Sequence, residues 1–153
     1  MVSPLRRLEQ LVREVGASAP AIDAAIGPVL AANDPSVIGP LLLLLRDDAD
    51  EDGMWSLLHA AESFDDEPYV RDVLRVLPLL NETSGRWSET LIIRILNSEA
   101  TRAHLIRQLA LAPDERKRAV GSVCARLVGI NARLADGLAR IAAALGEHAT
   151  SER

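Results

Sequence analysis

Residues 66–98 read DEPYVRDVLRVLPLLNETSGRWSETLIIRILNS, and they contain two consecutive segments with the apolar spacing of amphipathic helices. The first segment repeats apolar residues at intervals of three and four, namely Val70, Val73, Leu74, Leu77 and Leu80. The second segment has the same spacing in Trp87, Leu91, Ile92, Ile95 and Leu96. Such a period places each set on one face of a helix. Asp66 and Ser84 stand at the two starts, and both residue types favour helix N-caps.

Capping and helix-breaking residues divide the rest of the chain into similar segments. We expect further helices over residues 3–16, 18–33, 34–45, 52–64, 98–109, 114–128 and 131–145. Pro28 predicts a kink or a break in the second of these helices, and Pro40 interrupts the early part of the third. Asn131 is the expected first residue of the last helix, and residues 146–153 are expected to fray.

The fold class follows from the absence of any strand-like alternation bounded by hairpin turns. We expect an all-α protein with eight or nine short helices, stacked as antiparallel hairpins in a single domain over residues 1–153. The packing of the N-terminal helices in residues 1–46 is left open. Residues 73–79 and 105–111 resemble each other at an offset of 32, with identities at Arg75/Arg107, Leu77/Leu109 and Leu79/Leu111. Both a HEAT-like solenoid and an irregular helical bundle fit this pattern.

Composition excludes several classes of protein. Aromatic residues make up only 3% of the chain, so the core must be built from leucine, isoleucine, valine and alanine. A single cysteine, Cys124, excludes an internal disulfide and a multi-cysteine zinc site. No apolar run has the length of a signal peptide or a membrane span, which predicts a cytoplasmic protein. No phosphate-binding or dinucleotide-binding glycine motif is present, and we expect no cofactor.

Two motifs could carry chemistry near the fourth expected helix. Residues 48–53, DADEDG, match the first half of an EF-hand loop, but its twelfth position is His59 instead of the bidentate glutamate that calcium needs. An acidic loop at a helix N-terminus is therefore favoured, with no metal. His59 and Glu62 could form an acid–base pair. A semi-buried polar pair packed beside Trp55 is the favoured interpretation.

Two further features have structural interpretations. Cys124 lies on the apolar stripe of its helix, which indicates a small buried hydrophobic residue and not a nucleophile. Residues 116–118 form a short basic cluster, RKR, at a helix start. A solvated helix face is favoured there, because the chain carries a net charge of −5 and shows no basic footprint for direct nucleic-acid binding.

Charge is unevenly distributed along the chain. Residues 47–101 hold 13 acidic and four basic residues, whereas residues 102–153 carry a balance of +4. Eight acidic residues are the candidate partner-binding site: Asp47, Asp48, Asp50, Glu51, Asp52, Asp65, Asp66 and Glu67. They form two groups at opposite ends of the expected fourth helix, about 15–18 Å apart. Repulsion within each group is relieved by an opposing basic surface, which predicts a basic protein partner.

Residues 55–66, WSLLHAAESFDD, followed by Tyr69 and by residues 87–99, WSETLIIRILNSE, resemble a helical immunity-protein family. Such proteins accompany bacterial polymorphic toxins, including contact-dependent growth-inhibition systems. The resemblance covers about residues 50–110. It implies a cytoplasmic protein without enzymatic activity that binds and neutralises the C-terminal domain of one cognate toxin, often a nuclease. It also implies that the recurring residues are mostly scaffold: Trp55, His59, Glu62, Trp87, Arg94 and Asn97.

Two other functions fit the residues less well. A helical-repeat adaptor would bind a peptide or a helix of another protein through its helix faces. An enzyme would depend on His59 and Glu62 as its acid–base pair.

Overall fold

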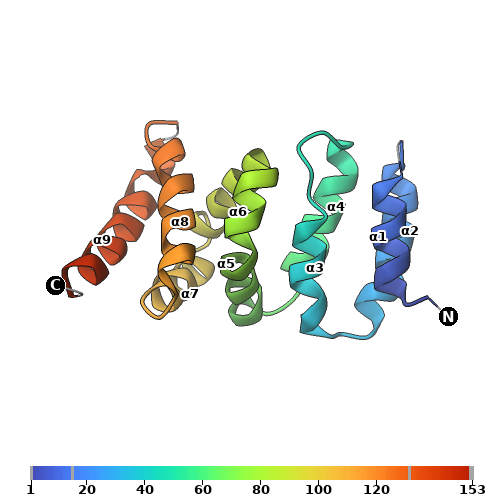
Figure 1. The fold of residues 1–153 in the computed structure, drawn as a ribbon, viewed down its shortest axis with the longest axis horizontal. Helices are drawn as coiled ribbons and strands as arrows, with labels where there is room; N and C mark the ends of the chain where they lie inside the picture. Colours follow the sequence, from blue (N-terminus) through green and yellow to red (C-terminus); the bar gives the residue numbers. More distant parts are fainter. Residues whose placement is uncertain (1, 15, 131, 152–153) are drawn as a thin grey trace. The chain divides into compact units, whose positions relative to one another are not determined.

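The computed structural model describes residues 2–14, 16–130 and 132–151 (Figure 1). Within these ranges the chain forms nine α-helices, two short 3-10 helices and no strand, which confirms the all-α prediction. The helices group into two compact units, Met1–Tyr69 and Val70–Arg153. The expected single domain over residues 1–153 stays a prediction.

The first unit contains five helical elements and the start of a sixth. They are α1 (Pro4–Arg13), α2 (Ala19–Ala31), η1 (Pro35–Val37), α3 (Ile38–Leu43) and α4 (Glu51–Glu62). Helix α2 packs against α1 and α4, and α3 also packs against α4 (Figure 1). The core of this unit is aliphatic, as the composition predicts, and its most buried members include Leu8, Ile22, Ile38, Leu41, Leu57 and Leu58.

Local capping explains where these helices begin. The Ser3 hydroxyl accepts a hydrogen bond from the Arg6 backbone N–H at 3.2 Å, and the Ser18 hydroxyl accepts one from Ala21 at 3.3 Å. Each bond satisfies one of the backbone donors that a helix start leaves without a partner. Asp34 caps η1 in the same way through the Ser36 N–H at 3.0 Å, which lowers the pKa of the Asp34 carboxyl. The predicted helix starts are confirmed here.

Three details differ from the sequence-based expectation. Helix α2 continues through Pro28, so a break at this position is wrong, and the alternative, a kink, stays a prediction. Pro28 and Ala24, whose carbonyl loses its helical partner, both lie on the exposed side of α2, where water can replace that bond. The third helix is split into η1 and α3, and Pro40 is tolerated because it falls in the first turn of α3. Asp66 is the first residue of its helix, one position later than a cap.

The second unit begins within α5 (Asp66–Thr83) and continues through five further elements. They are α6 (Gly85–Leu96), α7 (Glu99–Leu109), α8 (Asp114–Leu127), η2 (Ala132–Leu134) and α9 (Ala135–Ser151). Helix α6 packs against α7 and α8, and α9 packs against the same two helices. The apolar faces predicted for residues 66–98 are buried. Ser84 occupies the N-cap position of α6, as expected.

The last described segment of the chain, Ala135–Ser151, is helical. Asn131 lies outside the described residues, as do residues 15, 152 and 153. The backbone of α9 is helical as far as Ser151, so the helix enters the segment 146–153. Its fraying stays a prediction. No helix in the described part of the chain is both long and apolar enough to cross a membrane.

The residues of the internal similarity have matching environments in the second unit. Leu77 and Leu109 are both buried, and Arg75 and Arg107 are both exposed. Leu79 and Leu111 form the third identical pair, and both are exposed as well. Equal burial at equivalent positions is what a helical repeat requires. The solenoid repeat itself stays a prediction.

Candidate functional site

The eight candidate acidic residues all belong to the first unit and surround the two ends of α4. Seven of them are exposed and Asp66 is half-buried. We call this set the acidic face: Asp47, Asp48, Asp50, Glu51, Asp52, Asp65, Asp66 and Glu67. The first five lie in the loop before α4 and in its first turn, and the last three follow its end. Helix α4 therefore separates the two groups by about 18 Å at 1.5 Å per residue.

The loop before α4 is held by Arg46. Its Nε and Nη2 atoms donate to the two carboxylate oxygens of Asp48, each at 3.1 Å, which is a bidentate ion pair. The hydrogen bonds from Arg46, together with its positive charge, hold the pKa of Asp48 below its ordinary value. The Arg46 backbone N–H also contacts Met54 Sδ at 3.3 Å. Asp48 therefore has a structural partner, and its charge is partly compensated.

Asp50 has a structural role at the N-terminus of α4. Its Oδ1 accepts a hydrogen bond from the Asp52 backbone N–H at 3.4 Å, which caps the helix. Glu51 and Asp52 occupy the first turn, where the helix dipole favours negative charge. The acidic loop thus stabilises the start of α4. Glu51 and Asp52 remain exposed, so their carboxylates face solvent.

The second acidic group begins at the turn between α4 and α5. The Ser63 hydroxyl donates to the Ala60 carbonyl at 2.6 Å as α4 ends, and the Tyr69 backbone N–H donates to the Asp65 carbonyl at 3.1 Å. Asp66 and Glu67 form the first turn of α5. Here again acidic residues lie at a helix N-terminus, so both groups are placed by the same electrostatic preference.

His59 and Glu62 do not form the semi-buried pair that the sequence predicts. His59 is exposed and Glu62 is half-buried. The predicted packing beside a tryptophan is confirmed, because the ring centroids of His59 and Trp55 lie 5.7 Å apart with an angle of 36° between the planes. His59 is exposed because positions 55, 59 and 62 fall on the side of α4 opposite its buried residues.

The EF-hand resemblance does not extend to the fold. Gly53 is a buried residue inside α4, not the turn of a calcium loop. Asp48 is bound by Arg46, and Asp50 caps the helix. The described part of the chain contains no group of three or more histidine, cysteine, aspartate or glutamate residues that could hold a metal ion.

Two residues of the second unit differ in how well their environments were predicted. Cys124 is buried, as expected, and burial raises the pKa of its thiol to about 11, which leaves it unreactive near neutral pH.

Lys117 is only 8% exposed, so the prediction of a solvated face is wrong for this residue. Its Nζ has no hydrogen-bond partner within the described ranges. The aliphatic stem of Lys117 lies on the buried side of α8, which also carries Ala119 and Val120.

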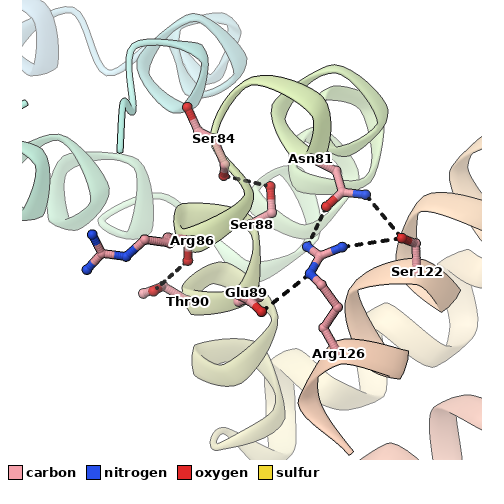
Figure 2. Close-up of polar contacts among 8 residues, drawn as sticks. All are labelled: Asn81, Ser84, Arg86, Ser88, Glu89, Thr90, Ser122 and Arg126. Carbon is pink, nitrogen blue, oxygen red and sulfur yellow. Dashed lines mark hydrogen bonds and ion pairs between the residues drawn. The ribbon is translucent and has the colours of Figure 1, made fainter. Parts of the chain in front are cut away.

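Sequence reasoning missed a polar cluster that joins three helices of the second unit (Figure 2). Arg126 of α8 donates to Asn81 of α5 at 2.6 Å, to Glu89 of α6 at 3.3 Å and to Ser122 at 3.3 Å. Asn81 also donates to Ser122 at 3.4 Å. Asn81 and Glu89 lie 45 and 37 positions before Arg126 in the sequence, so no local pattern indicates these two contacts. The cluster links α5, α6 and α8 through polar side-chain contacts at the surface.

The second unit also has an apolar pocket of about 470 Å³. Val128 and Gly129 of the turn after α8 line one part of it, and Leu138 with alanines of η2 and α9 lines the rest. Its lining carries no titratable side chain. The lining therefore supplies no acid, base or charged side chain for catalysis or for binding a charged ligand.

Comparison with known proteins identifies the family. The family model described as Immunity protein 30 matches residues 10–105, which extends the similarity from the two quoted motifs into α1 and α2. The matched range includes the whole acidic face and ends within α7. No curated protein and no solved structure gives a significant match to the chain. Because the matched range is more than half of its 153 residues, this chain belongs to the Immunity protein 30 family and is an immunity protein that neutralises a cognate toxin.

Proposed function

We propose that the protein neutralises its toxin by binding a basic surface of the toxin domain with the acidic face. The observation that carries this proposal is the exposure of these carboxylates on one unit, in a stretch where no arginine or lysine occurs between Arg46 and Arg71. Like charges held together on a surface raise the local negative potential. A basic partner relieves that repulsion and is steered toward the surface during association.

The proposed partner is the C-terminal domain of the toxin, acting as a nuclease. A nuclease needs a basic surface to hold the phosphates of its substrate. The acidic face presents carboxylates to that surface in place of phosphates. Occupying it would block substrate binding, and the immunity protein would need no catalytic group and no direct contact with nucleic acid. Delivery of the toxin by contact-dependent growth inhibition, and a cytoplasmic site of action, belong to the same proposal.

The test is a binding titration against the C-terminal domain encoded by the adjacent upstream gene, at low and at high salt. We expect tight binding that weakens as salt rises, because the screening length falls from roughly 10 Å at 0.1 M to roughly 3 Å at 1 M. Binding that is indifferent to salt would place the affinity in apolar contacts and contradict the acidic face as the driving force.

A charge-reversal variant locates the surface. Glu51→Lys with Asp65→Lys changes one exposed residue at each end of α4 and spares Asp48 and Asp50, which have structural partners. We expect the affinity to fall by about tenfold or more at low salt and the difference to narrow at high salt. Glu14→Lys with Asp23→Lys is the matched control, since it makes the same change in net charge at two exposed acids outside the acidic face. Equal affinities of the three proteins would place the interface elsewhere.

A further inference from the structure

The exposed side of α4 carries more than acidic residues. Its buried side consists of small and apolar residues: Gly53, Met54, Leu57, Leu58, Ala60 and Ala61. The opposite side is exposed or half-buried and consists of Glu51, Asp52, Trp55, Ser56, His59, Glu62 and Ser63. At 100° per residue, Trp55 and His59 fall near the centre of this exposed side. The helix therefore presents an aromatic pair between carboxylates at its two ends.

The exposure of this pair contrasts with the other tryptophan. Trp87 is 7% exposed and belongs to the core of the second unit, as a scaffold residue should. Trp55 is half-buried, and its ring contacts His59, which is exposed. Burying the remaining aromatic surface against a partner is favourable, and tryptophan is enriched among the residues that dominate binding energy. The pair, with Trp55 half-buried and His59 exposed, is therefore suited to an interface as well as to the scaffold.

The carboxylates next to the pair indicate which side chain it would bind. Asp52 precedes Trp55 by three residues, and Glu62 follows His59 by three, so each ring has a carboxylate one helical turn away on the same side. A guanidinium group stacks on aromatic rings and pairs with carboxylates in a planar fork. A lysine ammonium group has no planar face to stack and no fork. The combination favours arginine.

We propose that Trp55 and His59 anchor the toxin interface by stacking against an arginine side chain of the toxin domain, while Asp52 or Glu62 pairs with its guanidinium group. This inference rests on the proposed function, because it places the anchor within the surface between the two acidic groups. The acidic residues then form the charged rim of the interface, and the aromatic pair forms its centre. An aromatic centre with a polar rim is the usual organisation of a protein interface.

Three substitutions in the full chain test the anchor. Each variant is titrated with the toxin domain encoded by the adjacent upstream gene. We expect Trp55→Ala to weaken binding by about tenfold, which corresponds to about 1.4 kcal/mol, and His59→Ala to weaken it by about threefold. Ser56→Ala is the matched control on the same side of α4, and its affinity should stay within about twofold of the unmodified chain. Circular dichroism checks the fold. His59 is exposed, so His59→Ala keeps the test valid if Trp55→Ala fails to fold.

Free arginine separates the stacking contact from general electrostatics. At equal ionic strength, added arginine should weaken binding of the unmodified chain more than added lysine does. This difference should disappear in Trp55→Ala. If free arginine and free lysine weaken binding of the toxin domain to the unmodified chain to the same extent, the assignment to arginine is wrong.

The results also distinguish this inference from the proposed function. If Glu51→Lys with Asp65→Lys weakens binding while both aromatic variants bind like the unmodified chain, the acidic face stands and the anchor is overturned. If the aromatic variants weaken binding and charge reversal does not, the anchor stands and the proposed acidic driving force is overturned. If neither set has an effect on a toxin domain that binds, both are overturned.

Discussion

Gly53 of α4 lies so close to Ile22 of α2 that a Cβ atom on Gly53 would be 2.6 Å from Ile22 Cδ1. Both residues are buried, and Ile22 is only 1% exposed, so a Cβ atom on Gly53 would force the end of the Ile22 side chain to shift within the core. The backbone of Gly53 is not in the left-handed region. The glycine is therefore needed for close helix packing and not for a turn.

Replacing Gly53 by alanine should destabilise the first unit through this contact. Overpacking a core costs about 1–3 kcal/mol, and alanine returns up to about 1 kcal/mol through its better helix propensity. We expect Gly53→Ala to lower the free energy of unfolding by about 1 kcal/mol in a urea titration. In an Ile22→Val background, which lacks Cδ1, the same substitution should no longer destabilise the protein and should raise the free energy of unfolding by up to about 1 kcal/mol. A cost that persists in that background would assign the effect to something other than this contact.

Removing the buried ammonium group of Lys117 should stabilise the protein. An amine buried without a hydrogen-bond partner loses its hydration without compensation. Methionine preserves the length of the side chain, so Lys117→Met should raise the free energy of unfolding by about 1 kcal/mol. Arg118→Met is the matched control on the exposed side of α8 and should change it by less than about 0.5 kcal/mol. A destabilised Lys117→Met would show that the amine makes a favourable interaction in solution.

Arg126 should matter for stability through the shape of its guanidinium group as well as its charge. Its side chain is 39% exposed and that of Glu89 is 26% exposed, so the ion pair is partly screened. We expect Arg126→Ala to lower the free energy of unfolding by about 1 kcal/mol. Arg126→Lys should recover less than half of this loss, because one ammonium group cannot reach Asn81, Glu89 and Ser122 together. If Arg126→Lys restored the full free energy of unfolding, the contribution of Arg126 would come from its charge alone.

The buried thiol of Cys124 should make the folded protein lose stability at alkaline pH. Burial raises the pKa of the folded thiol from an ordinary value of 9.0 to about 11. The unfolded chain therefore loses this proton first, and the stabilisation present below pH 9 is lost as the pH rises toward 11. Unfolding titrations from pH 8 to pH 11 should show a steeper decline for the unmodified chain than for Cys124→Ala. Parallel declines would mean that the thiol ionises equally in both states.

Local information in the sequence was sufficient for the helices. Ser3, Ser18 and Asp34 satisfy helix-start donors within three residues of themselves, and the apolar period needs only neighbouring positions. The exposure of the acidic face was also predictable in kind, because carboxylates next to one another are rarely buried. The two groups lie at the ends of α4 because α4 has the length that its apolar period indicates.

The predictions that failed concern the surroundings of a residue. Pro28 stays within α2 because it falls on the exposed side, and Lys117 is buried because its stem lies on the packed side of α8. The exposure of His59 depends on which side of α4 packs against α2 and α3. In each case the residue type predicts an intrinsic preference for breaking a helix or for being exposed or buried. The packing of neighbouring helices then decides the outcome.

The sequence by itself determined the all-α class, the positions of the helices, the acidic charge of the first unit and the family, since capping, apolar period and charge are properties of neighbouring residues. Only the tertiary structure decided that Gly53 is a packing contact, that Arg126 joins α5, α6 and α8, and that Trp55 and His59 meet on the exposed side of α4. These relationships depend on which helix faces come together. Burial and shape complementarity across distant segments select those faces, and neither is encoded in any single stretch of the chain.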